Sequence, residues 1–145
     1  MIAMLPVAAA LFMLMPGNGR GLALLAAGIG GVGMLVAAIL QAMLVVGSVR
    51  FEQTFNTVLT TGGAIGLWLM MSNALLIETG TLPIGLVVLG IAAGAGYVLT
   101  MLAFRIGGQE HPLSYIGATV ALLGYSAWSV WLGRISQLEG LVAWS

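Results

Sequence analysis

The sequence predicts an all-α polytopic transmembrane bundle of about five membrane segments, with short loops between antiparallel neighbours. Of its 145 residues, 61% are hydrophobic and only 6% are charged, and the mean hydropathy is +1.14. A soluble domain carries about 25% charged residues. The apolar runs are long, show no strand-like alternation and exceed the length of barrel strands. The segments are therefore expected to be membrane helices, and a soluble enzyme is excluded.

Charge and residue usage narrow the classes of partner and cofactor. The formal net charge is zero, so no basic face attracts nucleic acid. The chain has no cysteine and a single histidine, which argues against thiolate chemistry and multi-histidine metal or haem sites within one copy. We predict no cofactor, and a bound lipid, pigment or quinone stays open because few ligating side chains exist to identify one.

Five apolar stretches approach the roughly 20 residues that are needed to cross the hydrocarbon. The expected segments cover about residues 1–15, 21–49, 57–77, 83–104 and 112–133, and the tail 138–145 is expected at the interface. The first is short and contains Pro6, and we interpret it as a short spanning helix or the remainder of one. It lacks the basic start of a cleaved signal peptide. We expect all 145 residues to belong to one integral membrane domain.

The loops between these segments are short, so consecutive helices are expected to be antiparallel neighbours. Five crossings place Arg50 and Arg105 on one side of the membrane, and Arg20 and Arg134 on the other. The positive-inside rule counts such residues in short loops, and here the count is a tie. The sequence therefore does not predict an orientation.

Two amides lie inside the apolar segments, where an unpaired amide costs several kcal/mol. Gln41 precedes Arg50 by nine residues, which places it roughly 13 Å below that interface. We expect Gln41 to bond into a polar layer with Tyr97 and Thr119. Asn73 lies roughly 25 Å from the same side. The groups expected at its level are Ser126 and Ser129.

Small residues follow helical spacing on three segments. Gly62 and Gly66 form one GxxxG motif, and Gly90 and Gly94 form another. On the fifth segment, one face carries Tyr115, Thr119, Leu122, Ser126, Ser129 and Gly133. Such faces favour close helix packing, with a polar pore or solute path as the alternative.

The ionisable residues that could carry chemistry are expected at one membrane face: Arg50, Glu52, Arg105, Glu110 and His111. Glu110 and His111 could act as an acid/base pair, or His111 could bind a metal or pigment. The favoured interpretation is an interfacial cluster of salt-bridged anchors, because charges that flank membrane segments are ordinary. At the opposite interface, Trp128, Trp131 and Trp144 are expected to form an aromatic belt.

Several runs carry a family resemblance: residues 18–25, 63–68, 73–76, 80–86 and 90–94. They resemble an uncharacterised bacterial family of multi-helix membrane proteins, a domain of unknown function, in which a Gly-x-Leu-Pro hinge joins two helices. The family usually has a further helix before the position of Met1, and this sequence departs from it there. The resemblance implies no catalytic residue, and we expect the bacterial inner membrane as the location.

The leading hypothesis is therefore a non-enzymatic integral membrane protein with membrane lipids and other transmembrane helices as partners. It would act as a packing or accessory subunit of a membrane complex, or as a homo-oligomer. One alternative is a small channel or transporter for neutral or apolar solutes that uses Gln41, Tyr97 and Thr119. The other is an intramembrane enzyme that uses Glu110 and His111.

Overall fold

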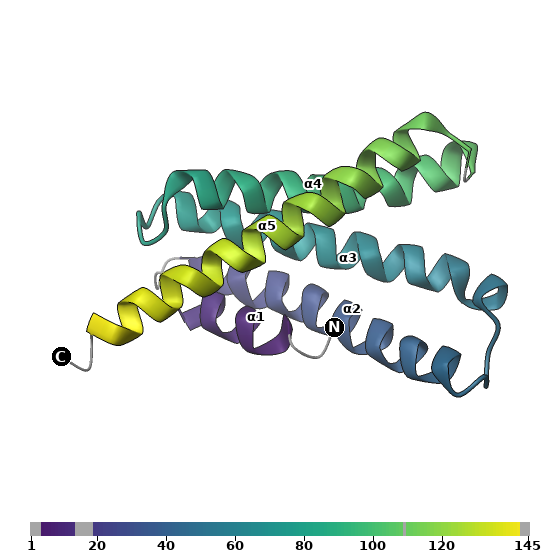
Figure 1. Cartoon of the computed structure of the whole chain (residues 1–145), viewed down its shortest axis with the longest axis horizontal. Coiled ribbons are helices and arrows are strands. Elements are labelled where there is room, and N and C mark those ends of the chain that lie inside the picture. Colours follow the sequence, from purple (N-terminus) through teal and green to yellow (C-terminus); the bar gives the residue numbers. More distant parts are fainter. Residues whose placement is uncertain (1–3, 14–18, 109, 143–145) are drawn as a thin grey trace.

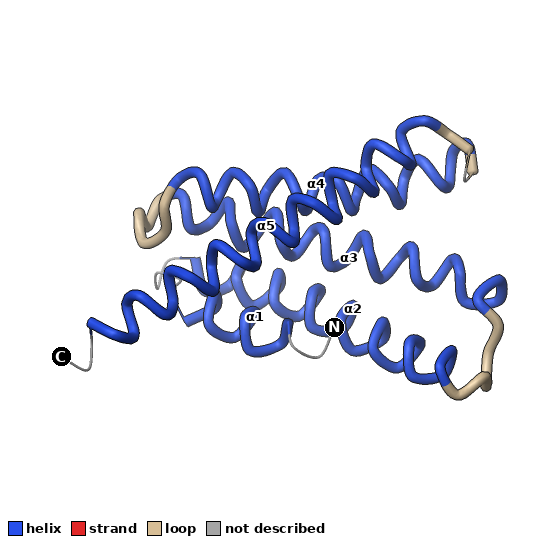
Figure 2. Tube along the Cα trace, viewed as in Figure 1, coloured by secondary structure: helices blue, strands red, loops and turns tan. Residues whose placement is uncertain are grey.

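The computed structural model describes residues 4–13, 19–108 and 110–142, and within these ranges the chain is helical apart from short turns (Figures 1 and 2). The elements are α1 (Met4–Met13), α2 (Arg20–Val45), α3 (Phe51–Ile77), α4 (Ile84–Gly107) and α5 (Pro112–Val142). No strand occurs in the described ranges, which confirms the all-α class. Four of the helices are long and apolar enough to cross a membrane: α2, α3, α4 and the part of α5 from Pro112 to Ile135.

Every extensive helix contact joins two helices that are consecutive in the sequence: α1 with α2, α2 with α3, α3 with α4, and α4 with α5. Figure 1 shows the α2–α3 and α4–α5 turns at one end of the bundle and the α3–α4 turn at the other. Neighbouring long helices therefore run in opposite directions. In the same view α5 crosses the bundle obliquely, and α1 lies beside α2.

The ten described residues of α1 rise by about 15 Å, which is about half of the hydrocarbon thickness. This part of α1 does not reach across the bilayer by itself. Residues 1–3 and 14–15 of the expected first segment lie outside the described residues. Leu11 is 1% exposed and belongs to the core, so α1 is held against the bundle by apolar packing.

Three helix boundaries differ from the expected segments because helices end where backbone hydrogen bonds end, not where hydropathy falls. α2 stops at Val45, not near residue 49. The Ser48 N–H donates to the Met43 carbonyl at 2.9 Å and the Gly47 N–H donates to the Leu44 carbonyl at 3.1 Å. With φ of +70° at Gly47, this is a Schellman cap.

α3 begins at Phe51, six residues before the expected start, and its first turns are polar. The Gln53 side chain accepts from the Arg50 N–H at 3.2 Å and the Thr54 hydroxyl donates to the Phe51 carbonyl at 3.1 Å. α5 continues past Gly133 to Val142, so much of the tail expected at the interface belongs to this helix. Residues 143–145, with Trp144, lie outside the described residues.

Glycines let the backbones of α3, α4 and α5 approach closely. A Cβ on Gly66 would lie 2.7 Å from the Gly94 carbonyl oxygen, and a Cβ on Gly94 would lie 2.5 Å from the Gly66 carbonyl oxygen. At the next crossing, a Cβ on Gly96 would lie 2.5 Å from the backbone nitrogen of Ala121 in α5. These crossings leave no room for a side chain, and backbone atoms cannot move aside as a flexible side chain can.

The Gly66–Gly94 crossing predicts opposite signs for two matched glycine substitutions. Gly94→Ala should lower the free energy of unfolding by about 1–3 kcal/mol, because the added methyl group meets backbone atoms of α3. Gly31→Ala should raise the free energy of unfolding by up to about 1 kcal/mol, because nothing lies within 4 Å of its Cβ position and alanine is the better helix former. Thermal unfolding of both variants in one mild detergent measures the difference, and equal midpoints would contradict this crossing.

Candidate functional site

The most buried polar side chain among the described residues is Asn73 of α3, which is 0% exposed. Its Nδ2 donates to the Leu69 carbonyl at 2.8 Å, and its Oδ1 accepts from Trp128 Nε1 at 3.2 Å. A Cβ on Gly90 of α4 would collide with the Asn73 amide, so that glycine makes the space that the amide occupies. One side chain therefore connects α3, α4 and α5.

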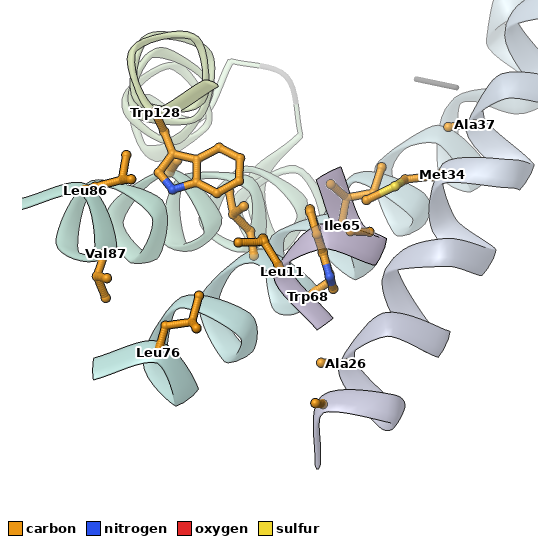
Figure 3. Packing of buried hydrophobic residues seen from close by; sticks show 14 residues of the cluster. Leu11, Ala26, Met34, Ala37, Ile65, Trp68, Leu76, Leu86, Val87 and Trp128 are labelled. Atoms are coloured by element: carbon orange, nitrogen blue, oxygen red, sulfur yellow. The ribbon is translucent and has the colours of Figure 1, made fainter. Parts of the chain in front are cut away.

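Trp128 is the partner that the sequence reasoning missed. It was expected in an interfacial belt, but it is 1% exposed and lies in the core. Figure 3 shows its indole reaching from α5 into the cluster that contains Leu86 and Leu11. The spacing of residues along α5 could have indicated this burial. Ser114, Gly117, Ala121 and Trp128 follow one another at steps of three, four and seven residues, and the structure buries all four. That spacing marks one helical face.

The two serines that were expected at the level of Asn73 do not bind it. Ser126 is exposed on α5. Ser129 is half-buried, and its Oγ has no hydrogen-bond partner among the described residues. The GxxxG glycines lie where the packing interpretation puts them: Gly66, Gly90 and Gly94 face neighbouring helices at close range. Gly62 is less crowded, since its Cβ position is 3.9 Å from Tyr97 Cδ1.

A pocket of about 310 Å³ opens between α2, α3 and α4. Most of its wall is aliphatic or aromatic. Its polar lining residues are Gln41 from α2, Thr61 from α3, and Tyr97 and Thr100 from α4. The Thr61 and Thr100 hydroxyls donate to carbonyls of their own helices, at 2.9 Å to Val58 and 2.8 Å to Gly96.

The expected polar layer of Gln41, Tyr97 and Thr119 is only partly assembled. Gln41 and Tyr97 line the same pocket, whereas Thr119 is exposed on α5 and does not line it. Within the described part of the chain, the Gln41 amide and the Tyr97 hydroxyl make no hydrogen bond. The predicted bonding of Gln41 into this layer is therefore not formed.

The depth estimate for Gln41 explains the difference. Only four residues, about 6 Å, separate Gln41 from the end of α2 at Val45. Gly30 faces Trp68 and Gly33 faces Thr61, so in this antiparallel pair Gln41 lies near the level of Thr57. The polar first turns of α3 end there. Gln41 is thus close to the membrane interface, where its amide does not need a partner from the protein.

The residues of the expected interfacial cluster lie at one end of the bundle, since Figure 1 shows the α2–α3 and α4–α5 turns at the same end. Arg105 Nη2 donates to the Thr60 hydroxyl at 2.9 Å, which joins α4 to α3. Arg50, Glu52 and Glu110 are exposed. The five residues of the interfacial cluster, which also includes Arg105 and His111, form no salt bridge with one another. The expected ion pairs between them are therefore not formed.

His111 has a local role at the start of α5. Its Nδ1 accepts from the Leu113 N–H at 3.3 Å, and its ring lies against Gly107. The Ser114 hydroxyl donates to the Gly108 carbonyl at 3.2 Å and completes this turn. No group of three potential metal-ligating His, Cys, Asp or Glu side chains occurs among the described residues. His111 Nδ1 is thus engaged in capping the start of α5, which leaves Nε2 as the ring nitrogen open to acid/base chemistry.

No protein-family model, curated protein or solved structure matches this chain. The resemblance to the bacterial membrane family stays a prediction, and residue roles here come from the geometry alone.

Two amide substitutions should separate the buried site from the interfacial one. Asn73→Leu should lower the free energy of unfolding by about 1–3 kcal/mol, because the Trp128 N–H is left buried without its acceptor. Gln41→Leu should change it by less than about 0.5 kcal/mol, because no hydrogen bond to a described residue is lost. Unfolding in detergent provides the measurement.

A double-mutant cycle with Trp128→Phe tests whether Asn73 acts through this bond. The Trp128→Phe change keeps an aromatic ring and removes the donor. A Gln41→Leu loss as large as that of Asn73→Leu, or additive effects of Asn73→Leu and Trp128→Phe, would contradict the assignment.

Proposed function

We propose that this protein is a non-enzymatic integral membrane protein that associates with another transmembrane helix through α5. It would serve as a packing or accessory subunit of a membrane complex, or as a homo-oligomer. The observation that carries the proposal is the uneven burial of the candidate spans. In the most apolar 18-residue stretch of each helix, 50% of α3 is buried inside the bundle, but only 17% of α5 is.

One flank of the exposed α5 surface carries polar and small residues, whereas the rest exposes aliphatic side chains such as Ile116, Leu123 and Val130. Tyr115 and Leu122 are 60% and 67% exposed, and Thr119, Ser126 and Gly133 are also exposed. Steps of four, three, four and seven residues separate these positions, which is the heptad spacing of a helix–helix seam. Polar and small side chains in membrane helices commonly face other helices, where they allow close approach and hydrogen bonding. This flank supports a partner helix better than lipid alone does.

The glycine motifs of α3 and α4 also support association through α5, because their glycines already pack against helices of the same chain. Gly66 and Gly94 contact one another's backbones, and Gly90 accommodates Asn73. These faces are engaged within the chain, so association with a further helix would use a different surface. The α5 flank is the surface that fits.

Two alternatives receive less support from the geometry. A solute path through Gln41, Tyr97 and Thr119 would need all three side chains to line one space, and Thr119 lies outside the pocket that the other two share. An enzyme that uses Glu110 and His111 would need these two side chains to act together, and no hydrogen bond joins them among the described residues, where His111 Nδ1 accepts from the Leu113 N–H. For location, the family resemblance supports the bacterial inner membrane.

Cysteine crosslinking tests the α5 surface directly because the native chain contains no cysteine. Ser126→Cys should give a crosslinked species in native membranes treated with a short bifunctional thiol reagent or an oxidant. Its mass would be that of two chains for a homo-oligomer, or of the chain plus its partner for a hetero-complex. Val88→Cys, on the exposed side of α4, is the matched control and should remain uncrosslinked.

Size analysis after mild-detergent extraction gives the second readout, with an assembly larger than one chain as the expected result. A monomer in mild detergent together with no crosslinking at Ser126→Cys would overturn the proposal. Equal crosslinking at Ser126→Cys and Val88→Cys would also overturn it, because it would indicate random collisions.

A further inference from the structure

His111 is the single histidine of the chain, and its imidazole lies in the turn that joins α4 to α5. It is the last residue before α5, which begins at Pro112. The ring lies against Gly107, the last residue of α4, because a Cβ on Gly107 would collide with the ring carbons. One titratable ring is therefore placed between the end of one membrane helix and the start of the next.

The start of α5 gives this ring a specific hydrogen-bond partner. Pro112 has no N–H, so the first backbone donor of α5 is the N–H of Leu113. This N–H donates to His111 Nδ1 at 3.3 Å. An N-cap side chain uses such a bond to satisfy a donor that has no carbonyl partner within the helix.

The other cap bonds of this turn end on carbonyl oxygens. The Ser114 N–H donates to the His111 carbonyl at 2.8 Å, and the Ser114 hydroxyl donates to the Gly108 carbonyl at 3.2 Å. Carbonyl oxygens do not titrate in water, whereas an imidazole nitrogen does. Of these three bonds, the one from Leu113 is thus the one that depends on a titratable group.

The Leu113 bond exists only for a neutral imidazole. A ring nitrogen accepts only when it carries no proton, so the neutral ring in this turn is the tautomer with its proton on Nε2. Protonation then takes place at Nδ1, and both ring nitrogens become donors. The Leu113 N–H loses its acceptor, and the new positive charge lies at the N-terminal end of α5, where the helix dipole disfavours a cation. Both effects weaken the first turn of α5.

Other titratable or charged side chains lie at this end of the bundle (Figure 1): Arg50 and Glu52 at the start of α3, Arg105 near the end of α4, Glu110 in the turn, and Tyr115 near the start of α5. In the described ranges, none of them forms a salt bridge or a hydrogen bond with the imidazole. Their charges and the C-terminal end of α4 affect how readily the ring takes up a proton. They do not change what this uptake does, because a protonated Nδ1 cannot accept from the Leu113 N–H.

We propose that His111 makes the start of α5 sensitive to pH. The cap is closed when the imidazole is neutral, and it opens as the pH falls through the range of about 5 to 8 in which imidazoles change charge. Because the capped state binds one proton fewer than the open state, the cap is lost as the pH falls and not as it rises. The two Ser114 bonds persist, so the change loosens the first turn of α5 and does not unfold the helix.

Solvent exchange of the Leu113 amide tests the proposal, measured by NMR on the full chain in detergent micelles. After correction for the intrinsic pH dependence of exchange, protection at about pH 5 should be about fivefold lower than at about pH 8, the factor that corresponds to one N-cap bond. The fall should follow the imidazole titration seen in the ring nitrogen signals. At the upper pH these signals should show Nδ1 without a proton.

Ser48 provides an internal control. Its N–H donates to the Met43 carbonyl in the cap of α2, at the same end of the bundle (Figure 1), so its protection should not change with the state of His111. His111→Asn is the matched variant, because asparagine is a preferred N-cap whose amide does not titrate. Leu113 in this variant should be equally protected at both pH values. His111→Ala removes the side-chain acceptor, and Leu113 protection should be low at both.

Leu113 protection that is independent of pH in the native chain would overturn the proposal, as would an equal fall in His111→Asn. A parallel fall at Ser48 would also overturn it, because the loss would then belong to the whole bundle. The result does not depend on whether α5 binds a partner helix, since the cap forms within one chain.

Discussion

The bundle depends on satisfying one amide in a place without water. Asn73 is fully buried, and hydrocarbon offers no alternative hydrogen-bond partner. Its two polar atoms are paired with Leu69 and Trp128, and Gly90 provides the space for them. The rotation of α5 about its axis is consequently fixed, because the Trp128 indole must point toward α3. That rotation turns the flank with Thr119 and Ser126 outward.

Close backbone approach is the second constraint, and it works together with the first. Apolar helices gain little from association with one another in lipid, so packing and hydrogen bonds determine their arrangement. Gly66 and Gly94 bring α3 and α4 into backbone contact, and Gly96 does the same for α4 and α5. α2 is joined less tightly, through Gly30 and Gly33. The pocket that Gln41 and Tyr97 line lies between α2, α3 and α4, beside this looser junction.

The sequence predicted the helical class and the four long helices, because uninterrupted hydropathy is a strong signal. It did not predict the helix ends: polar residues after Arg50 continue α3 through local hydrogen bonds, and Gly47 ends α2 early. The early end of α2 also explains the error for Gln41. Its expected depth in the membrane is measured from Arg50, whereas α2 already ends at Val45. Trp128 was misplaced because tryptophan is common at interfaces, and its buried partner lies 55 residues away. Such pairings depend on helix rotation, which composition does not specify.

The consecutive helix contacts also suggest an order of assembly. A chain whose helices contact mainly their sequence neighbours can build its bundle one helix at a time as it enters the membrane, with short loops to close. The Asn73–Trp128 bond is the exception, since it must wait for α5. Until then the Asn73 amide has its bond to the Leu69 carbonyl, which satisfies one N–H and leaves the Oδ1 acceptor free. The packing of α5 is therefore the step that completes the bundle, and the single hydrogen bond from Trp128 to Asn73 forms only when α5 packs in the correct rotation.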